Sequence, residues 1–191
     1  KRTINGLPGL NTAQELAEEY HDANKSLKKN INKLIRWQKK KGFTSGFFAS
    51  FGGFILLPAT IPVYLASVLY IQIRMVAAIA HLCGYDIKNP RIRTLVFLCL
   101  TGKNALKVLE DSGIDINNKL PVQIINGLSM KGLVKVNKKI VFSLLAQMSE
   151  LGLIGVSQLI PVASGLIGGL INLFSTSNIA TVAKDIFLPK E

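Results

Sequence analysis

The chain has 191 residues, 49% of them hydrophobic, and a formal net charge of +12 at neutral pH. This length suits one domain with a sizeable core, and the excess of Lys and Arg favours anionic partners such as lipid head groups, nucleic acid or an acidic protein. The two cysteines, Cys83 and Cys99, provide neither a disulfide framework nor the spacing of a zinc site, and are expected to be small buried hydrophobes.

Positive charge alternates with uncharged apolar sequence along the chain. Nearly all Lys and Arg residues lie in 1–41 and 74–150, whereas 42–73 and 151–183 contain no Asp, Glu, Lys or Arg. Such alternation is typical of a protein that binds or partly enters a membrane surface. A soluble bundle with solvated lysines and buried apolar helices accounts for the same pattern, so both interpretations stay open.

The first elements are a flexible arm over residues 1–11 and a basic amphipathic helix over 12–41. Thr12 and Glu15 have the spacing of a capping box, and one apolar stripe follows at helical spacing: Leu16, Tyr20, Ala23, Leu27, Ile31 and Leu34. Trp side chains favour the head-group layer of a membrane, and lysines favour anionic lipid. We therefore predict membrane contacts near the end of this helix, at Trp37, Lys39, Lys40 and Lys41. A solvated helix is the alternative.

An apolar helical hairpin is predicted over residues 42–83. Its first arm combines small residues spaced by four with a cluster of aromatic residues, which form either a membrane contact or a core: Phe43, Phe47, Phe48, Phe51 and Phe54. Pro58 ends this arm, Pro62 begins the second, and Gly84 is a natural helix C-cap. Arg74 lies inside the second arm and argues against a simple pair of membrane spans, because a charge at mid-depth is costly in lipid.

Central helices are predicted over residues 89–150. Asn89-Pro90 marks a helix start, 95–100 is a core segment, a short helix covers 103–111 and a polar loop covers 114–120. Further helices are expected over 121–129 and 133–148, the second with lysines opposite its apolar face: Lys135, Lys138 and Lys139 against Leu133, Val134, Val141, Leu144 and Leu145.

A second apolar hairpin, broken by Pro161, is predicted over residues 151–187. Its small residues Gly165 and Gly169 repeat the spacing seen in the first hairpin, so the two apolar runs are expected to pack on each other. Strand signals are weak throughout. The sequence thus predicts an all-α fold, a single compact helical bundle around two Pro-broken, Gly-rich apolar hairpins.

Residues 30–187 resemble the EcsC protein family, which is named for a protein encoded beside an ABC transporter. The resemblance rests on several segments: GFxxGFFASFGGFxxLP (42–58), LYIQIR (69–74), IAxxxGYD (79–86), PRxRTL (90–95), CLxG (99–102), Gly113-Ile114 with Lys119-Leu120, and 160–169. The pattern is more loosely similar to helical membrane domains that accompany some GTPases. Both likenesses imply an α-helical, membrane-associated domain, and neither supplies a catalytic residue.

The polar residues of these segments are interpreted as structural: Tyr70, Gln72, Arg74, Tyr85, Asp86, Arg91 and Arg93. A buried charge needs a partner, and Asp86 is a candidate partner for Arg74, Arg91 or Arg93. A site for a ligand or a lipid phosphate, built from the same arginines, is the alternative.

No catalytic, cofactor-binding or metal-binding motif is present. The sequence lacks a phosphate-binding glycine loop, His-Glu-x-x-His and Gly-x-Ser-x-Gly. More than half of its aromatic residues sit in the apolar runs, and Trp37 alone lies within the basic stretch from Lys25 to Lys41, which disfavours nucleic acid as a partner.

Three functions remain open. The first is a non-enzymatic, membrane-associated domain that binds anionic lipid or inserts its apolar hairpins, and is located at a membrane peripherally or partly inserted. The second is a membrane-disrupting toxin or effector module. The third is a soluble helical adaptor that binds an acidic protein or a transporter partner.

Overall fold

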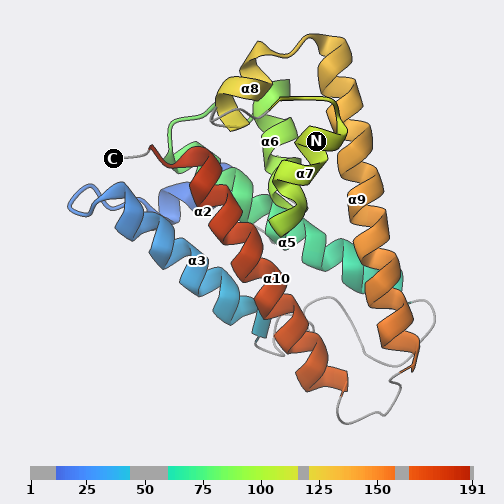
Figure 1. The fold of residues 1–191 in the computed structure, drawn as a ribbon. Helices are drawn as coiled ribbons and strands as arrows, with labels where there is room; N and C mark the ends of the chain where they lie inside the picture. Colours follow the sequence, from blue (N-terminus) through green and yellow to red (C-terminus); the bar gives the residue numbers. More distant parts are fainter. Residues whose placement is uncertain (1–11, 44–59, 116–120, 158–163, 190–191) are drawn as a thin grey trace.

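Helices make up all the regular structure in the part of the chain that the computed structural model describes, residues 12–43, 60–115, 121–157 and 164–189 (Figure 1). The elements, in chain order, are α2 (Ala13–Tyr20), α3 (Leu27–Phe43), α5 (Thr60–Leu82), α6 (Pro90–Cys99), the 3-10 helix η1 (Gly102–Asn104), α7 (Ala105–Asp111), α8 (Pro121–Gly127), α9 (Met130–Ser157) and α10 (Ser164–Phe187). The predicted all-α class is confirmed.

Helix α5 is the centre of the bundle. It packs against α2, α3, α6 and α10, and every side chain from Arg74 to Ala80 is buried. A helix that is largely apolar around its circumference is stable only when other elements cover it, so the sequence of α5 requires burial, and the fold decides which helices provide it. The packing of α10 on α5 agrees with the expected contact between the two apolar runs.

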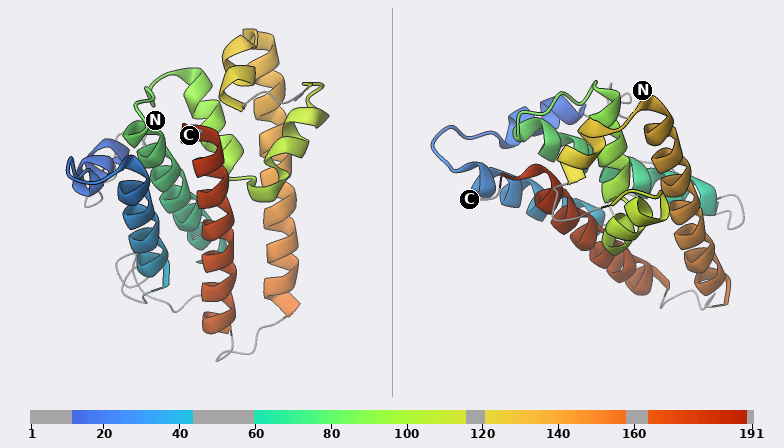
Figure 2. Two further views of the ribbon diagram at one scale, coloured as in Figure 1. Left: turned by 60° about the vertical axis from the view of Figure 1, so that its left-hand side comes forward. Right: turned by 45° about the horizontal axis from the view of Figure 1, so that its top comes forward.

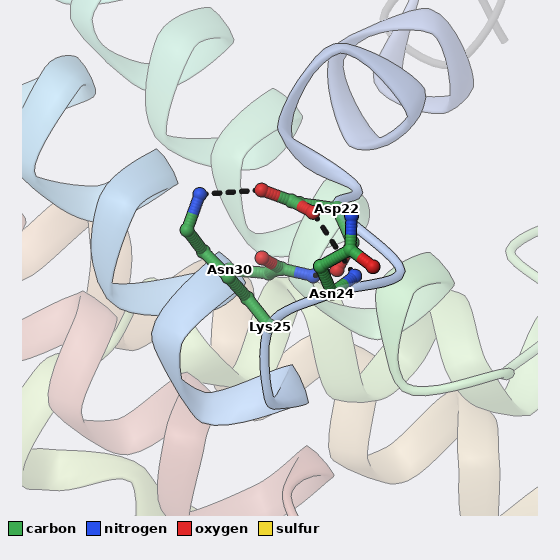
Figure 3. Close-up of polar contacts among 4 residues, drawn as sticks. All are labelled: Asp22, Asn24, Lys25 and Asn30. Atoms are coloured by element: carbon green, nitrogen blue, oxygen red, sulfur yellow. Dashed lines mark hydrogen bonds and ion pairs between the residues drawn. The ribbon is translucent and has the colours of Figure 1, made fainter.

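The predicted continuous helix over 12–41 is wrong, because a turn separates α2 from α3 (Figure 3). Asp22 Oδ1 accepts a hydrogen bond from the Asn24 N–H at 3.0 Å, and Asp22 Oδ2 forms an ion pair with Lys25. Asn30 Nδ2 donates back to the Asp22 carbonyl at 3.0 Å. Asp and Asn side chains compete with helical hydrogen bonds in this way, so Ala23, expected in the apolar stripe, is exposed in the turn.

Several helix ends have the signals that the sequence predicted. Thr12 and Glu15 form a capping box, with Glu15 N–H donating to Thr12 Oγ1 and Thr12 N–H to Glu15 Oε2. Gly84 follows α5 with φ +83°, while the Tyr85 N–H donates to the Ala80 carbonyl at 3.0 Å. Asn89 Oδ1 caps α6 by accepting from the Arg91 N–H at 2.9 Å.

The end of α8 and both ends of α9 differ from expectation. Helix α8 ends at Gly127 and α9 begins already at Met130. Helix α9 then continues to Ser157, into the second apolar run, where the sequence had predicted an end near Met148. The reason is compositional: residues 149–157 contain no Pro, so nothing forces the helix to stop there.

Candidate functional site

The outer face of α9, meaning the exposed side chains of Met130, Val134, Val141, Phe142 and Leu145, is the largest group of exposed apolar residues in the described part of the chain. Their exposed fractions run from 52% to 69%. Residues 130, 134, 141 and 145 are spaced by four, seven and four, which places them on one side of an α-helix. Only three other large apolar side chains among the described residues are comparably exposed.

The opposite side of α9 carries a second apolar stripe that faces the bundle. Leu133, Val136 and Ile140 are buried, and α9 packs there on α6 and α7. The expectation that lysines lie opposite all the apolar residues of this helix is therefore wrong. Leu133 does face inward, but Val134 and Val141 face outward together with the lysines.

Four lysines accompany the outer face of α9. Lys131, Lys135, Lys138 and Lys139 are all exposed, and the sequence has no acidic residue from 116 to 149. A shallow hollow of about 320 Å³ lies on this face, lined by Val134, Asn137, Lys138, Val141 and Phe142. The surface is thus both apolar and cationic. In the sequence, this surface is indicated by a second stripe of apolar residues at helical spacing. It is shifted by one position from the buried stripe of Leu133, Val136 and Ile140.

The outer face of α3, meaning Lys29, Lys33, Arg36, Trp37 and Lys40, is a second cationic surface. Its four basic residues are exposed and spaced by four, three and four, so they form one line along the helix. Trp37 is 47% exposed, and Lys40 Nζ lies 5.9 Å from the centroid of its ring. The predicted contacts Trp37 and Lys40 are therefore accessible to a partner.

The remaining predicted membrane contacts divide into two groups. Lys39 is half-buried, because its Nζ donates to Ser177 Oγ on α10 at 2.9 Å. For Lys41 and Phe43, the structure describes the backbone but not the side chain. Four further residues lie entirely outside the described part of the chain: Phe47, Phe48, Phe51 and Phe54.

Tyr70, Gln72 and Arg74 lie on α5, where Tyr70 is half-buried and the other two are buried. Gln72 Nε2 donates to Thr176 Oγ1 on α10 at 3.5 Å, and both side chains are buried. Arg74 is 5% exposed. Burial lowers the pKa of its guanidinium, while Tyr70 and Glu19 act in the opposite direction by favouring the charged form.

Asp86 does not pair with the arginines as proposed from the sequence. It is exposed, and its Oδ1 accepts a hydrogen bond from the Lys88 N–H at 2.9 Å. Among the described residues its carboxylate forms no ion pair with Arg74, Arg91 or Arg93. The carboxylate that acts on Arg74 belongs to Glu19 of α2, a helix that packs closely on α5.

The other polar residues of the predicted motif stabilise helix connections. Tyr85 stacks at a tilt on Phe187 of α10, with ring centroids 5.4 Å apart. Arg91 Nη2 donates to the Leu128 carbonyl at 3.0 Å and so joins α6 to the segment before α9. Arg93 is half-buried on the same helix. The contacts of Tyr85 and Arg91 thus join α6 and α10 to neighbouring segments of the bundle.

Burial makes both cysteine thiols less acidic than a free thiol. Burial raises the pKa of the Cys83 thiol to about 11 and that of Cys99 further, so both thiols are protonated and weakly nucleophilic at neutral pH. Within the described ranges, no three His, Cys, Asp or Glu side chains come together as metal ligands.

These features define an all-helical bundle with two cationic, partly apolar helix faces. In the described part of the chain, no helix is both long enough and apolar enough to cross a bilayer. The family model described as EcsC protein family matches residues 8–188, and the chain therefore belongs to the EcsC family. No curated protein and no solved structure matches it.

Proposed function

We propose that the protein is a non-enzymatic, membrane-associated domain that docks on anionic lipid through the outer face of α9. The observation that carries the proposal is the exposed apolar stripe of Met130, Val134, Val141, Phe142 and Leu145, bordered by four exposed lysines. An amphipathic helix of this composition lies in the plane of a membrane interface, with apolar side chains among the acyl chains and lysines at the head groups.

The energies support docking of the folded domain. Complete burial of one such apolar side chain contributes roughly 1.5–3 kcal/mol, so a side chain that is already half-covered still gains about 1 kcal/mol. Each lysine close to an anionic surface adds about 1 kcal/mol. Five apolar and four basic residues together contribute about 9 kcal/mol, which is comparable with the roughly 4–15 kcal/mol that association costs in lost translation and rotation.

The proposal places the protein at the membrane surface. Arg74 and Gln72 are packed inside the bundle through contacts with α2 and α10, and the docking surface on α9 is already exposed in this folded state. Docking through α9 therefore requires no opening of the bundle, unlike the membrane-disrupting mechanism considered from the sequence.

Co-sedimentation with vesicles tests the proposal. We expect binding to phosphatidylserine-containing vesicles at low salt and much weaker binding to phosphatidylcholine vesicles. The double variant Phe142→Gln and Leu145→Gln should weaken binding by about thirtyfold, which corresponds to about 2 kcal/mol.

The matched control is Phe97→Gln with Leu106→Gln. It exchanges the same residue types, which are 36% and 53% exposed, on α6 and α7, and should leave vesicle binding unchanged. If the wild type binds neither vesicle, the proposal fails, and the basic faces are better explained by an acidic protein partner. If both double variants bind like the wild type, α9 is not the contact.

A further inference from the structure

We propose that the outer face of α3 is a second docking surface for an anionic bilayer, so that the domain can bridge two anionic membrane surfaces. The inference rests on the proposed docking through α9. It starts from the line of Lys29, Lys33, Arg36 and Lys40, all exposed, beside the half-exposed Trp37.

The chemistry of this face suits lipid head groups. The stretch from Lys25 to Lys41 contains eight basic residues and no acidic one, and polybasic helices attract anionic lipid without needing a shaped partner surface. Trp37 supplies the amphipathic ring that favours the head-group layer. A stable protein interface needs a broader apolar centre than one half-exposed Trp provides, so a bilayer fits this face better than an acidic protein does.

The two docking faces point away from each other. Helix α3 packs on α2, α5 and α10, whereas α9 packs on α6 and α7. The side chains of Ile31 and Leu34 on α3, and of Val136 and Ile140 on α9, are buried against these neighbours. Figures 1 and 2 show α3 and α9 on opposite sides of the bundle, with α10 between them. A bilayer in contact with the outer face of α9 therefore leaves that of α3 accessible to a second surface.

Repulsion between like charges disfavours an alternative route to bridging, in which two copies meet through one of these faces. Each copy would bring four lysines on α9, or three lysines and Arg36 on α3, against the same set. Anionic lipid neutralises both faces, so the expected bridge is one protein between two vesicles.

The test compares binding with clustering of phosphatidylserine-containing unilamellar vesicles, by co-sedimentation and dynamic light scattering. The wild type should both bind and cluster them. The triple variant Lys29→Gln, Arg36→Gln and Lys40→Gln should still sediment with vesicles, with affinity within about threefold of wild type, and should lose clustering. Lys33 is left unchanged because its Nζ lies 5.8 Å from the Tyr20 ring.

The control variant is Lys88→Gln, Lys103→Gln and Lys107→Gln, which removes the same net charge from exposed positions outside both faces. It should cluster vesicles like the wild type. Wild-type protein that binds without clustering overturns the bridging inference and leaves the proposed function intact. The bridging inference is also overturned if the α3 triple variant clusters vesicles as strongly as the wild type does. Absence of any binding overturns both proposals.

Discussion

The buried side chain of Gln38 is an unusual residue in the core of the bundle. It is 1% exposed, and neither its Nε2 nor its Oε1 has a hydrogen-bond partner among the described residues. It continues the buried stripe of Ile31 and Leu34 on α3, where apolar side chains pack on α5 and α10. A buried amide without partners costs folding free energy.

We therefore expect Gln38→Leu to raise the free energy of unfolding by about 1–2 kcal/mol, measured by urea denaturation. Gln72→Leu is the control, because Gln72 donates to Thr176 across the α5–α10 contact. That change should lower stability by about 1 kcal/mol. A destabilised Gln38→Leu variant would show that the amide is hydrogen-bonded in solution.

Asp22 makes the stability of the turn between α2 and α3 dependent on pH. The hydrogen bond from Lys25, with a second from the Asn24 N–H, lowers the pKa of the Asp22 carboxyl below its usual value of 3.8. A carboxyl with a depressed folded-state pKa contributes stability above its unfolded pKa, and this contribution is lost as pH falls through the folded pKa.

The variant Asp22→Asn should therefore have a lower urea midpoint than wild type at pH 7, because it lacks the ion pair with Lys25. The difference between the two midpoints should shrink as the pH falls below about 4. A difference that is constant from pH 7 to pH 2.5 would contradict the role of the charge.

At the scale of elements, helix ends depend on the backbone conformation of single residues. Gly84 ends α5 with φ +83°, and a Cβ added there would meet no atom within 4 Å. Gly84→Ala should therefore lower stability through backbone strain alone, by about 1–2 kcal/mol in thermal or urea unfolding.

The control is Gly127→Ala at the end of α8, where the added Cβ also meets nothing and φ is not positive. This change should be neutral or stabilising by about 0.5–1 kcal/mol. Equal effects of the two substitutions would show that the conformation of Gly84 is not the cause.

Helix α9 shows which element properties can be predicted from sequence. Its lysines and apolar residues predicted an amphipathic helix, and the helix is present. The sequence contains two apolar stripes, however, and periodicity alone does not say which one other helices cover. Leu133 and Ile140 are covered by α6 and α7, whereas Val134 and Val141 are left to solvent.

At the scale of the whole molecule, the net charge of +12 should make membrane binding dependent on salt. Screening shortens the reach of the basic faces, with a Debye length of roughly 14 Å at 50 mM and about 4 Å at 500 mM salt. The affinity for anionic vesicles should therefore fall at least tenfold over this range, measured by co-sedimentation.

The binding that remains at 500 mM salt should come from the apolar stripe of α9, and Phe142→Gln with Leu145→Gln should remove it. Neutral vesicles serve as the control, since their weak binding should hardly change with salt. An affinity for anionic vesicles that is the same at both salt concentrations would contradict an electrostatic contribution.

The sequence by itself determined the helical class and the separation of cationic from apolar segments. It also determined the helix ends at Thr12, Gly84 and Asn89. These features depend on residues within about one helical turn, so local composition decides them. The turn at Asp22 also depends on local residues. The sequence nevertheless predicted one continuous helix there, because apolar residues recur at helical spacing on both sides of the turn.

Only the tertiary structure decided which helix faces stay exposed and which groups surround the buried polar residues. Glu19, not Asp86, is the carboxylate that acts on Arg74, because α2 packs on α5. The outer face of α9 is free because the helices of the bundle cover just one of its two apolar stripes. Both outcomes depend on contacts between segments far apart in the chain, which spacing within one segment does not encode.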